Sequence, residues 1–597
     1  MDGSPSLDLG VIGNCAIGAL IDRSARIVWC ALPRFDGDPV FHALLGEGTG
    51  GTHGDWCVEL EGCEHSTQDY LPNTAVLRTR LRSSDGSGLE VIDFCPRFCA
   101  RNRMFRPLML VRRLRPLNGA PRIRIRLRPS CGYGERRPLL ARGSNHIRYV
   151  DAALSLRLTT NAPLSYILDE TSFLLEEPLS LLLGTDDMLQ SGVEETARTF
   201  QERTEDYWRQ WVRRLALPLE WQEAVIRAAV TLKLCTYEET GAIIAALTTS
   251  VPEGPGTVRN WDYRYCWLRD AFFVVRALNS LSETETMEHY LRYLANIVRD
   301  SPDGHLQPVY GIALERRLGE REVPTLPGYR GMAPVRVGNQ AFEHLQHDVY
   351  GNVVLASAQA YFDLRLQRPH RHADFERLER VGGRAYEVYA TPDASMWELR
   401  TRARVHTSSA LMCWAACDRL ARIAAELDRP ERSRLWQQRA DEIRAAIEKR
   451  AWNPARNAYV ESFDGNDVEA GLLLMAEVGF AGRDDQRFAA TVTAIEAGLR
   501  KDQHLYRYDA ADDFGPPVTA FNGCTFWYID VLARLGRTTE ARTLFEGMLA
   551  CRNHVGLLSE DIDPRTGELW GNYPQTYSQV GIINVAMRLS RRWEEKV

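Results

Sequence analysis

Apolar and polar residues alternate along short segments of the first third of the chain. In residues 122–128, arginines on one face alternate with isoleucine and leucine on the other, and residues 153–158 alternate in the same way. Residues 75–81 and 89–94 flank a Ser-Asp-Gly-Ser-Gly sequence, which is typical of a hairpin turn. Because a period of two puts every second side chain on one face of a strand, several such strands between turn signals predict a β-sandwich.

From about residue 220 onward, apolar residues recur at the spacing of α-helices. A charged helical segment at residues 194–215 comes before this region. The pattern therefore predicts a β-sandwich domain at residues 1–193, a linker helix at 194–219 and a helical domain at 220–597. The predicted helices of the last domain are 224–236, 271–281, 286–298, 349–364, 408–426, 431–450, 470–478, 485–499, 525–535, 539–550 and 579–590.

The connections between these helices are long and rich in Trp, Tyr, Gly and Pro. Long loops on a rigid helical scaffold commonly carry function. Periodicity alone predicts many antiparallel helices and does not fix their arrangement.

The composition limits the classes of function. The 597 residues are too many for one ordinary core, and 45% of them are apolar, so we expect a multidomain globular protein. The formal net charge of −6, with arginines and acidic residues interleaved, argues against a nucleic-acid partner, which needs a basic stripe. The sequence shows no signal peptide and no apolar run of about 18 residues, which predicts a cytoplasmic protein without a membrane partner.

The 13 cysteines are scattered along the chain. The close pairs Cys95/Cys99 and Cys413/Cys417 have no histidine at a metal-ligand spacing. We therefore expect reduced, mostly buried thiols, no metal ion and no cofactor. The sequence does not decide between a monomer and a homo-oligomer.

Residues 259–270 carry the densest group of chemically active side chains. Four aromatic residues, three arginines and two aspartates lie within this segment, and an apolar helical run follows from Ala271. Aromatic faces pack against the C–H faces of sugar rings. An arginine next to an aspartate offers donors and an acceptor that suit a set of hydroxyl groups. The alternative is a buried ion pair among core aromatics, but the whole cluster favours a carbohydrate site at the start of a helix.

Two glutamates stand out by their neighbours, and cleavage of a glycosidic bond needs an acid and a base. Glu398 follows Trp397 in a loop before a helix. An indole beside a carboxyl group would exclude water and raise its pKa, as a general acid requires. Glu560 lies before a turn and is followed by an aromatic, amide-rich loop at residues 567–575. The alternative for each is a solvated loop glutamate.

Several long motifs in a fixed order make the chain resemble glycoside hydrolase family 15, which includes glucoamylases, glucodextranases and a bacterial and archaeal trehalase-like branch. Residues 9–22 and 28–36 are similar to the β-sandwich domain of that branch, and residues 259–270 are similar to the most specific motif of the family. Residues 328–339, 346–351 and 567–575 match further blocks. The resemblance covers nearly the whole chain.

The resemblance implies an N-terminal β-sandwich joined by a helix to an (α/α)6 barrel, which would be the catalytic domain. It implies inverting hydrolysis of a small-molecule α-glucoside, with release of β-glucose from a non-reducing end. Glu398 matches the general acid of the family and Glu560 its general base. Arg269 and Asp270 match the pair that binds the terminal glucose, and Trp267 matches a tryptophan of the same subsite. Tyr263 matches the aromatic residue that helps to position the attacking water. The other residues expected at the substrate are Trp397 and Arg400, beside the acid, and Tyr329 and Arg336 of the 328–339 block.

The chain departs from the trehalase-like branch in two places. Ser408, Ser409 and Ala410 stand where that branch usually has a His-Ser-Lys stretch, and residues 512–522 replace a stretch that usually carries a Glu-Gly pair. Both departures affect the region expected around the leaving group and leave the substrate open. α,α-Trehalose is the first choice, and an α-1,4 or α-1,6 gluco-oligosaccharide is the enzymatic alternative. A non-catalytic carbohydrate-binding protein is the alternative of another class.

Overall fold

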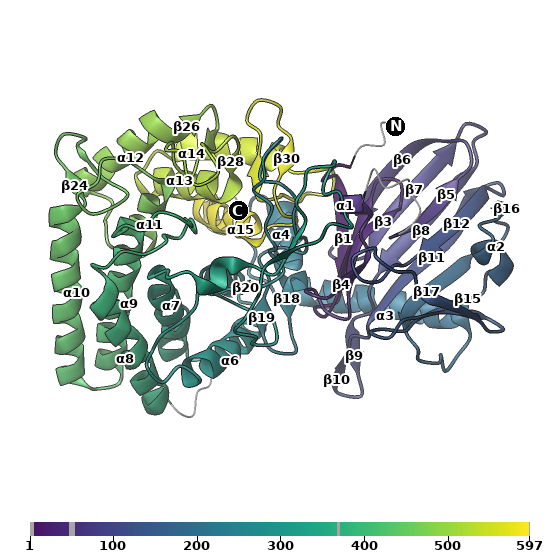
Figure 1. Ribbon diagram of the computed structural model, residues 1–597, viewed down its shortest axis with the longest axis horizontal. Helices are drawn as coiled ribbons and strands as arrows, with labels where there is room; N and C mark the ends of the chain where they lie inside the picture. The colour runs from purple at the N-terminus through teal and green to yellow at the C-terminus, as the bar shows by residue number, and fades with distance from the viewer. Residues whose placement is uncertain (1–4, 47–53, 367–370, 596–597) are drawn as a thin grey trace.

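The computed structural model describes residues 5–46, 54–366 and 371–595, which form a β-rich part and a helical part (Figure 1). The strands of the N-terminal part lie at one end of the molecule and the helices of the C-terminal part at the other. Buried apolar side chains from both parts belong to one connected cluster. Because burial of apolar surface is the main favourable contribution to folding, the two parts stabilise each other.

Two antiparallel sheets form the N-terminal part, which is the predicted β-sandwich. The alternation that predicts a strand at 122–128 is present in β12 (Arg122–Arg128), where Ile123, Ile125 and Leu127 are buried and the arginines are more exposed. The seven-stranded sheet has the order β1 (Leu9–Gly13), β2 (Gly18–Asp22), β3 (Ile27–Leu32), β5 (Asp55–Leu60), β12 and β16 (Phe173–Leu174), with β4 (Asp38–Phe41) paired to β3. The eight-stranded sheet has the order β13 (Leu139–Arg142), β14 (His146–Val150), β15 (Leu156–Thr160), β17 (Leu179–Thr185), β11 (Met109–Asn118), β8 (Gly88–Phe94), β7 (Leu77–Ser83) and β6 (Cys63–Tyr70).

Helix α3 (Val193–Arg213) follows the last strand of the sandwich. Trp208 and Trp211 are buried on one side of this helix, and the opposite side is charged. Contacts with β17 and with the short strand β9 (Phe98–Ala100) place α3 along the sandwich, as Figure 1 shows. The domain limits at residues 193 and 219 stay a prediction.

The C-terminal part is the predicted (α/α)6 barrel. Six inner helical segments contact one another in chain order and close a ring, because the last of them, α15, also contacts the first, α5. The inner segments are α5 (Leu268–Ser280), α7 (Asp348–Phe362), α9 (Thr407–Glu426), α11 (Leu474–Glu477) with the 3-10 turn Ala470–Leu473, α13 (Asn522–Arg534) and α15 (Thr576–Leu589). The outer helices are α4 (Gln222–Leu234), α6 (Glu285–Arg299), α8 (Arg371–Val388), α10 (Pro430–Arg450), α12 (Gln486–Leu499) and α14 (Thr538–Ala550).

Helix α8 is absent from the predicted helices, so the sequence prediction is wrong at residues 371–388. The segment is rich in charged residues and contains Gly382 and Gly383, which lower helix propensity. Tertiary packing explains why a helix forms. A Cβ atom at Gly382 would lie 2.1 Å from the side chain of Leu420 and 3.1 Å from that of Trp436, so the glycine allows α8 to approach α9 and α10 closely.

A buried guanidinium fixes the barrel to the sandwich. Arg264 belongs to the barrel, but it donates to the backbone oxygen of Gly37 at 2.7 Å and to the hydroxyl of Tyr133 at 3.0 Å, both in the sandwich. Asp262 accepts two further hydrogen bonds from Arg264, each of 2.8 Å, and neither side chain is exposed. A buried ion pair persists when its hydrogen bonds are satisfied, as they are here. The segment 259–270 is therefore held by both parts of the molecule.

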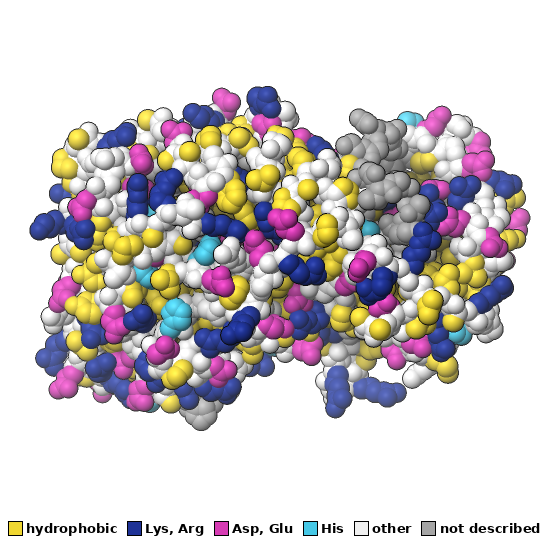
Figure 2. Space-filling view, in the orientation of Figure 1, with side chains coloured by type: hydrophobic (Ala, Val, Ile, Leu, Met, Phe, Trp, Pro, Cys, Tyr) yellow, Lys and Arg dark blue, Asp and Glu magenta, His cyan; other side chains and the backbone are white. Residues whose placement is uncertain are grey.

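Positive and negative side chains are interspersed over the face shown in Figure 2. This mixture agrees with the small net charge of −6. Within the described ranges, the helices are all too short or too polar to cross a membrane.

Candidate active site

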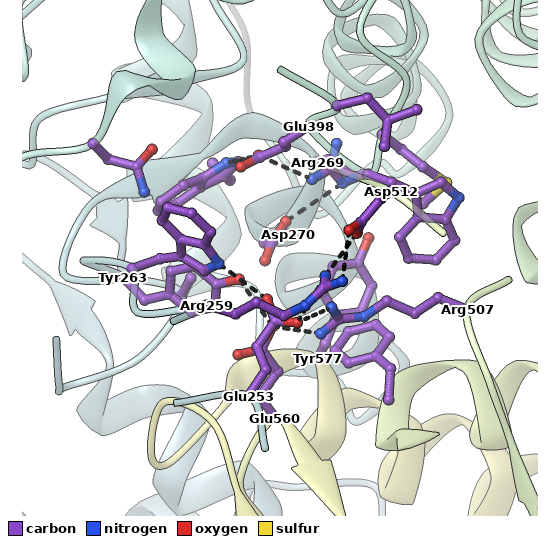
Figure 3. Close-up of a pocket in the computed structure, with 18 of the residues that line it drawn as sticks. Glu253, Arg259, Tyr263, Arg269, Asp270, Glu398, Arg507, Asp512, Glu560 and Tyr577 are labelled. Atoms are coloured by element: carbon purple, nitrogen blue, oxygen red, sulfur yellow. Dashed lines mark hydrogen bonds and ion pairs between the residues drawn. The ribbon is translucent and has the colours of Figure 1, made fainter. Parts of the chain in front are cut away.

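A pocket in the barrel brings together segments that are far apart in the sequence (Figure 3). The segment 259–270 forms one wall, and the loop before α9 forms another. In the view of Figure 3, Glu398 and Glu560 lie on opposite sides of the pocket with Asp270 between them. Of the residues predicted for the site, those that line the pocket are Tyr263, Trp267, Arg269, Asp270, Trp397, Glu398, Arg400 and Glu560.

Glu398 is held at the pocket wall by a sharp turn and by a tryptophan. Its backbone φ is 60°, in the left-handed region that is unusual for a glutamate and is often found at functional sites. Trp267 Nε1 donates to Glu398 Oε1 at 2.6 Å, and the guanidinium of Arg269 lies 3.7 Å from the same oxygen. The carboxyl group therefore has a fixed direction.

The tryptophan bonded to Glu398 is not its neighbour in the sequence. The indole of Trp397 donates instead to Glu469 Oε2 at 2.6 Å and packs edge-on against Tyr508, with 5.9 Å between the ring centroids. Trp397 lines the pocket, as predicted, but the indole that contacts the Glu398 carboxyl group belongs to Trp267. Proximity along the chain was a poor guide because the backbone turns sharply at Glu398.

Glu560 lies deep in the pocket, with 3% of its surface exposed, directly before the short strand β29 (Asp561–Ile562). Its Oε1 accepts hydrogen bonds from the hydroxyl of Tyr263 at 2.9 Å and from Arg507 at 2.8 Å. Its Oε2 has no hydrogen-bond partner among the described residues. Burial raises the pKa of Glu560 well above its usual range, and the positive charge of Arg507 opposes this rise. Oε2 is buried as well, and a Cβ atom at Gly571 would lie 2.9 Å from it.

Arg507 is a central residue that the sequence analysis missed. Its guanidinium donates to Glu253 at 2.6 Å, to Glu560 at 2.8 Å and to Asp561 at 3.0 Å. These partners lie 254, 53 and 54 positions away in the sequence, so no local pattern marks the arginine. Further lining residues that were not singled out from the sequence are Glu253, His344, Tyr508, Trp527 and Tyr577.

Arg269 and Asp270 lie in the first turn of α5 and line the pocket together. Arg269 is bonded to Asp348 at 3.2 Å and to Gln346 at 3.0 Å. Burial raises the pKa of Asp270 to about 7, although the charge of Arg269 opposes the rise. Asp270 Oδ1 has no hydrogen-bond partner among the described residues. Arg269 and Asp270 thus line the pocket as a buried pair, with 3.7 Å between the guanidinium and the carboxylate.

The predictions that Arg400, Arg336 and Tyr329 lie at the substrate have different outcomes. Arg400 lies over the ring of Trp261 at 4.5 Å and lines the pocket. Arg336 also covers Trp261, at 5.0 Å, but does not line the pocket. Tyr329 is buried, and its hydroxyl donates to the backbone oxygen of Pro5 at 3.1 Å. The structure thus does not bring Arg336 and Tyr329 to the pocket wall, because the backbone of the 328–339 block directs these side chains elsewhere.

The two segments in which the chain departs from the trehalase-like branch lie at different places. Ser409 is in the first turn of α9, where its hydroxyl donates to Asp393 at 2.6 Å, away from the pocket. Asp512, in contrast, lines the pocket and accepts two hydrogen bonds from Arg259, of 2.7 and 2.6 Å. Asp513 accepts from the backbone of Thr401 at 3.3 Å. Residues 512 and 513 therefore join the segment 259–270 to the loop that carries Glu398.

Among the residues that the structure describes, no group of three or more His, Cys, Asp or Glu side chains is arranged to hold a metal ion. The cysteines of the same residues are free thiols. The lining consists of carboxylates, guanidinium groups, amides and aromatic rings, which together suit the hydroxyl groups and C–H faces of a sugar.

Comparison with known protein families extends this description. The family model described as Glycosyl hydrolases family 15 matches residues 221–587, and the model described as Trehalase-like, N-terminal matches residues 4–164. The first match covers more than half of the chain. The chain belongs to glycosyl hydrolase family 15. The predicted family and the predicted enzyme class, a glycoside hydrolase, are thus confirmed.

Individual relatives of this family 15 enzyme include proteins named trehalase. The chain is 30% identical to one from Thermoplasma acidophilum, covering 97% of this chain and 99% of the relative, and 30% identical to one from Mycolicibacterium smegmatis, covering 99% and 92%. Among solved structures, a bacterial glucoamylase complexed with acarbose matches with a TM-score of 0.70 and 13% identity, covering 98% of this chain and 95% of that one. At that identity the match supports the fold alone, a β-sandwich followed by an (α/α)6 barrel.

Proposed function

We propose that this family 15 enzyme hydrolyses α,α-trehalose with inversion, with Glu398 as general acid and Glu560 as general base. The observation that supports these roles is the pair of carboxyl groups on opposite sides of one pocket, with Asp270 between them (Figure 3). The full-length similarity to proteins named trehalase supports the substrate. A gluco-oligosaccharide substrate has only the fold-level likeness to a glucoamylase in its favour. A non-catalytic role is disfavoured because both carboxyl groups are present.

In the proposed reaction, Arg269 and Asp270 bind the hydroxyl groups of one glucose ring. Glu398 protonates the glycosidic oxygen while Glu560 takes a proton from a water molecule. The water oxygen bonds to the anomeric carbon from the face opposite the leaving group as the C–O bond breaks, so the configuration inverts. Tyr263, bonded to Glu560, orients the base.

The substrate is tested by a glucose-release screen over trehalose, maltose, isomaltose, kojibiose, nigerose and soluble starch. We expect the kcat/KM for trehalose to be about 30–150-fold above that for maltose or isomaltose, which corresponds to about 2–3 kcal/mol from one well-placed set of hydrogen bonds to the leaving ring. Cleavage of maltose or isomaltose with trehalose left intact would replace trehalose by a gluco-oligosaccharide in the proposal.

The stereochemical outcome is expected to show inversion. Both anomeric carbons of trehalose are α, so a single displacement must give one β-glucose from the attacked ring and one α-glucose from the leaving ring, in equal initial amounts. Proton NMR spectra recorded before mutarotation measure the two anomers. If α-glucose alone is formed initially, the enzyme retains configuration and the assigned roles are incorrect.

Arg507→Gln is expected to move the acidic limb of the pH profile of kcat/KM to higher pH. The base must be ionised, burial raises the pKa of Glu560, and the positive charge of Arg507 lowers it. Removal of this charge raises the pKa further, so the loss of activity is greatest at low pH and shrinks as the pH rises through the new limb. We expect a loss of about 100-fold at pH 5 and a smaller loss at pH 8.

The control for this variant is Arg500→Gln, because Arg500 pairs with Glu540 outside the pocket. Arg507→Lys keeps the charge and is expected to leave the acidic limb near its original position. Equal losses at pH 5 and pH 8 in Arg507→Gln, with a folded protein, would show that Arg507 does not set the ionisation of Glu560.

We also propose, on the sequence evidence, that the enzyme acts in the cytoplasm on a small carbohydrate, with neither a nucleic acid nor a membrane as partner. Cell fractionation tests the location. Analytical ultracentrifugation decides between a monomer and a homo-oligomer.

A further inference from the structure

A second cavity adjoins the substrate pocket. The two share four lining residues, which are Trp397, Leu399, Tyr508 and Asp512. The second cavity has a volume of about 210 Å³, against about 100 Å³ for the substrate pocket on the same measure. If the substrate pocket admits a glucose ring, the second cavity has room for one as well. Its remaining walls come from the segment before α9, from residues 456 and 461, from residues 467–469, from the end of α12 and from residues 509–511.

Two buried polar side chains in this cavity lack partners. Glu469 is 2% exposed, and its Oε1 has no hydrogen-bond partner among the described residues, although Oε2 is bonded to Trp397. His406 is 3% exposed, and neither of its ring nitrogens makes a well-aligned hydrogen bond to the described residues. Buried polar groups without a partner are unfavourable, so hydrogen bonds from a ligand that reaches these side chains would be stabilising.

The charges around the cavity favour a neutral ligand. Burial lowers the pKa of His406 to about 4 and raises that of Glu469 to about 8, so both are uncharged near neutral pH. Arg404 is paired with Glu461 at 2.5 Å. The cationic lining residues Arg402, Arg404 and Arg456 are balanced by Glu461, Asp467, Asp509 and Asp512. An anion would find no excess of positive charge here, whereas hydroxyl groups can both donate to and accept from these groups.

The aromatic residues of the cavity match the same ligand class. Trp397 and Tyr508 supply ring surface at the wall that faces the substrate pocket. Apolar ring surface combined with a few convergent polar groups is typical of sites for small neutral molecules such as monosaccharides.

We propose that this cavity is a second monosaccharide-binding site whose ligand is glucose, the product of the reaction. The identity of the ligand rests on the proposed function, while the existence of the site rests on the cavity and its unpartnered groups. Glucose bound there contacts Trp397, which also lines the substrate pocket. Bound glucose therefore affects the pocket wall next to Glu398 while the substrate pocket stays free to bind substrate. For this reason, inhibition of hydrolysis by glucose is mixed rather than purely competitive.

Gly498 offers a way to fill the cavity without changing a catalytic residue. It lies near the end of α12 and lines the cavity. A Cβ atom at this position would meet only Val468, at an ordinary contact distance of 3.5 Å. Gly498→Leu therefore places a side chain into the cavity. Gly383→Leu is a matched control, because Gly383 is also a half-buried helical glycine and a Cβ atom there meets nothing within 4 Å.

The test is equilibrium dialysis with labelled D-glucose. We expect the original protein and Gly383→Leu to bind the same number of glucose molecules per chain, because both keep the cavity and the substrate pocket. Gly498→Leu should bind one fewer. Asp270→Ala, which removes a contact in the substrate pocket, should keep the glucose that Gly498→Leu loses, and the double variant should lose it. Val468→Phe fills the cavity from another wall and repeats the measurement if Gly498→Leu does not fold.

Two results would overturn the proposal: no glucose bound to Asp270→Ala, or the same number of glucose molecules per chain in the original protein and in both cavity-filling variants. The first means that all bound glucose lies in the substrate pocket, and the second that none lies in the cavity. Dialysis measures glucose binding without turnover, so its result does not depend on whether the enzyme hydrolyses trehalose. The failure of one proposal can therefore be distinguished from the failure of the other. Kinetic confirmation is a change of glucose inhibition from mixed to competitive in Gly498→Leu.

Discussion

Glu560→Ala is expected to lose hydrolysis of trehalose and of α-glucosyl fluoride alike, by about 10²–10⁴-fold in kcat/KM. The fluoride needs almost no help from an acid, but both substrates need an activated water molecule. Without the Glu560 carboxylate, no other group is proposed to take the proton. The two remaining partners of Arg507, Glu253 and Asp561, keep its guanidinium paired, so the fold should persist.

Glu568→Ala is the matched control for this prediction, because Glu568 is close in sequence but pairs with Arg330 outside the pocket. It should retain normal rates on both substrates. Should Glu560→Ala still cleave the fluoride at a normal rate, Glu560 is not the base. Initial-rate measurements of glucose and fluoride release decide this.

Glu398→Gln is expected to separate the same two substrates. The leaving sugar oxygen of trehalose must be protonated, so the variant should lose about 10²–10⁴-fold on trehalose and much less on α-glucosyl fluoride. Glutamine keeps the size of the side chain and can still accept the hydrogen bond from Trp267. The difference between the two substrates therefore reports proton transfer rather than a collapsed pocket.

One result would contradict the role of Glu398 as the acid. If Glu398→Gln loses the same factor in kcat/KM on trehalose and on the fluoride, Glu398 is not the acid, and the result would be consistent with a base. Glu469→Gln is a useful companion, since its carboxyl group bonds Trp397 rather than Glu398. It should not discriminate between the two substrates.

Patterns within short stretches of sequence predicted the parts of the site that are themselves local. The cluster at 259–270 was found because aromatic, basic and acidic residues are adjacent there, and Tyr263, Trp267, Arg269 and Asp270 all line the pocket. Glu398 and Glu560 were singled out by their apolar and aromatic neighbours, and the resemblance to the family matched them to the general acid and the general base.

Contacts between residues that are far apart in the sequence could not be predicted from the sequence. Arg507 is held by three carboxylates on two distant segments, and Glu469 is marked only by its hydrogen bond from the indole of Trp397. Helix α8 was missed because close packing of Gly382, rather than local propensity, favours it. Tyr329 and Arg336 belong to a matched block, but a motif does not show which of its side chains turn toward the pocket.

The adjacent residues Tyr263 and Arg264 face different neighbours, the first bonding Glu560 and the second bonding Gly37 and Tyr133 of the sandwich. One dipeptide thus ties the position of the proposed base to a domain that contributes no proposed catalytic group. The barrel therefore cannot be transferred to another protein without its sandwich and still keep these contacts. A chimaera that receives a foreign sandwich must preserve the backbone approach at Gly37 and the hydroxyl at Tyr133, or it inherits a buried guanidinium without two of its acceptors.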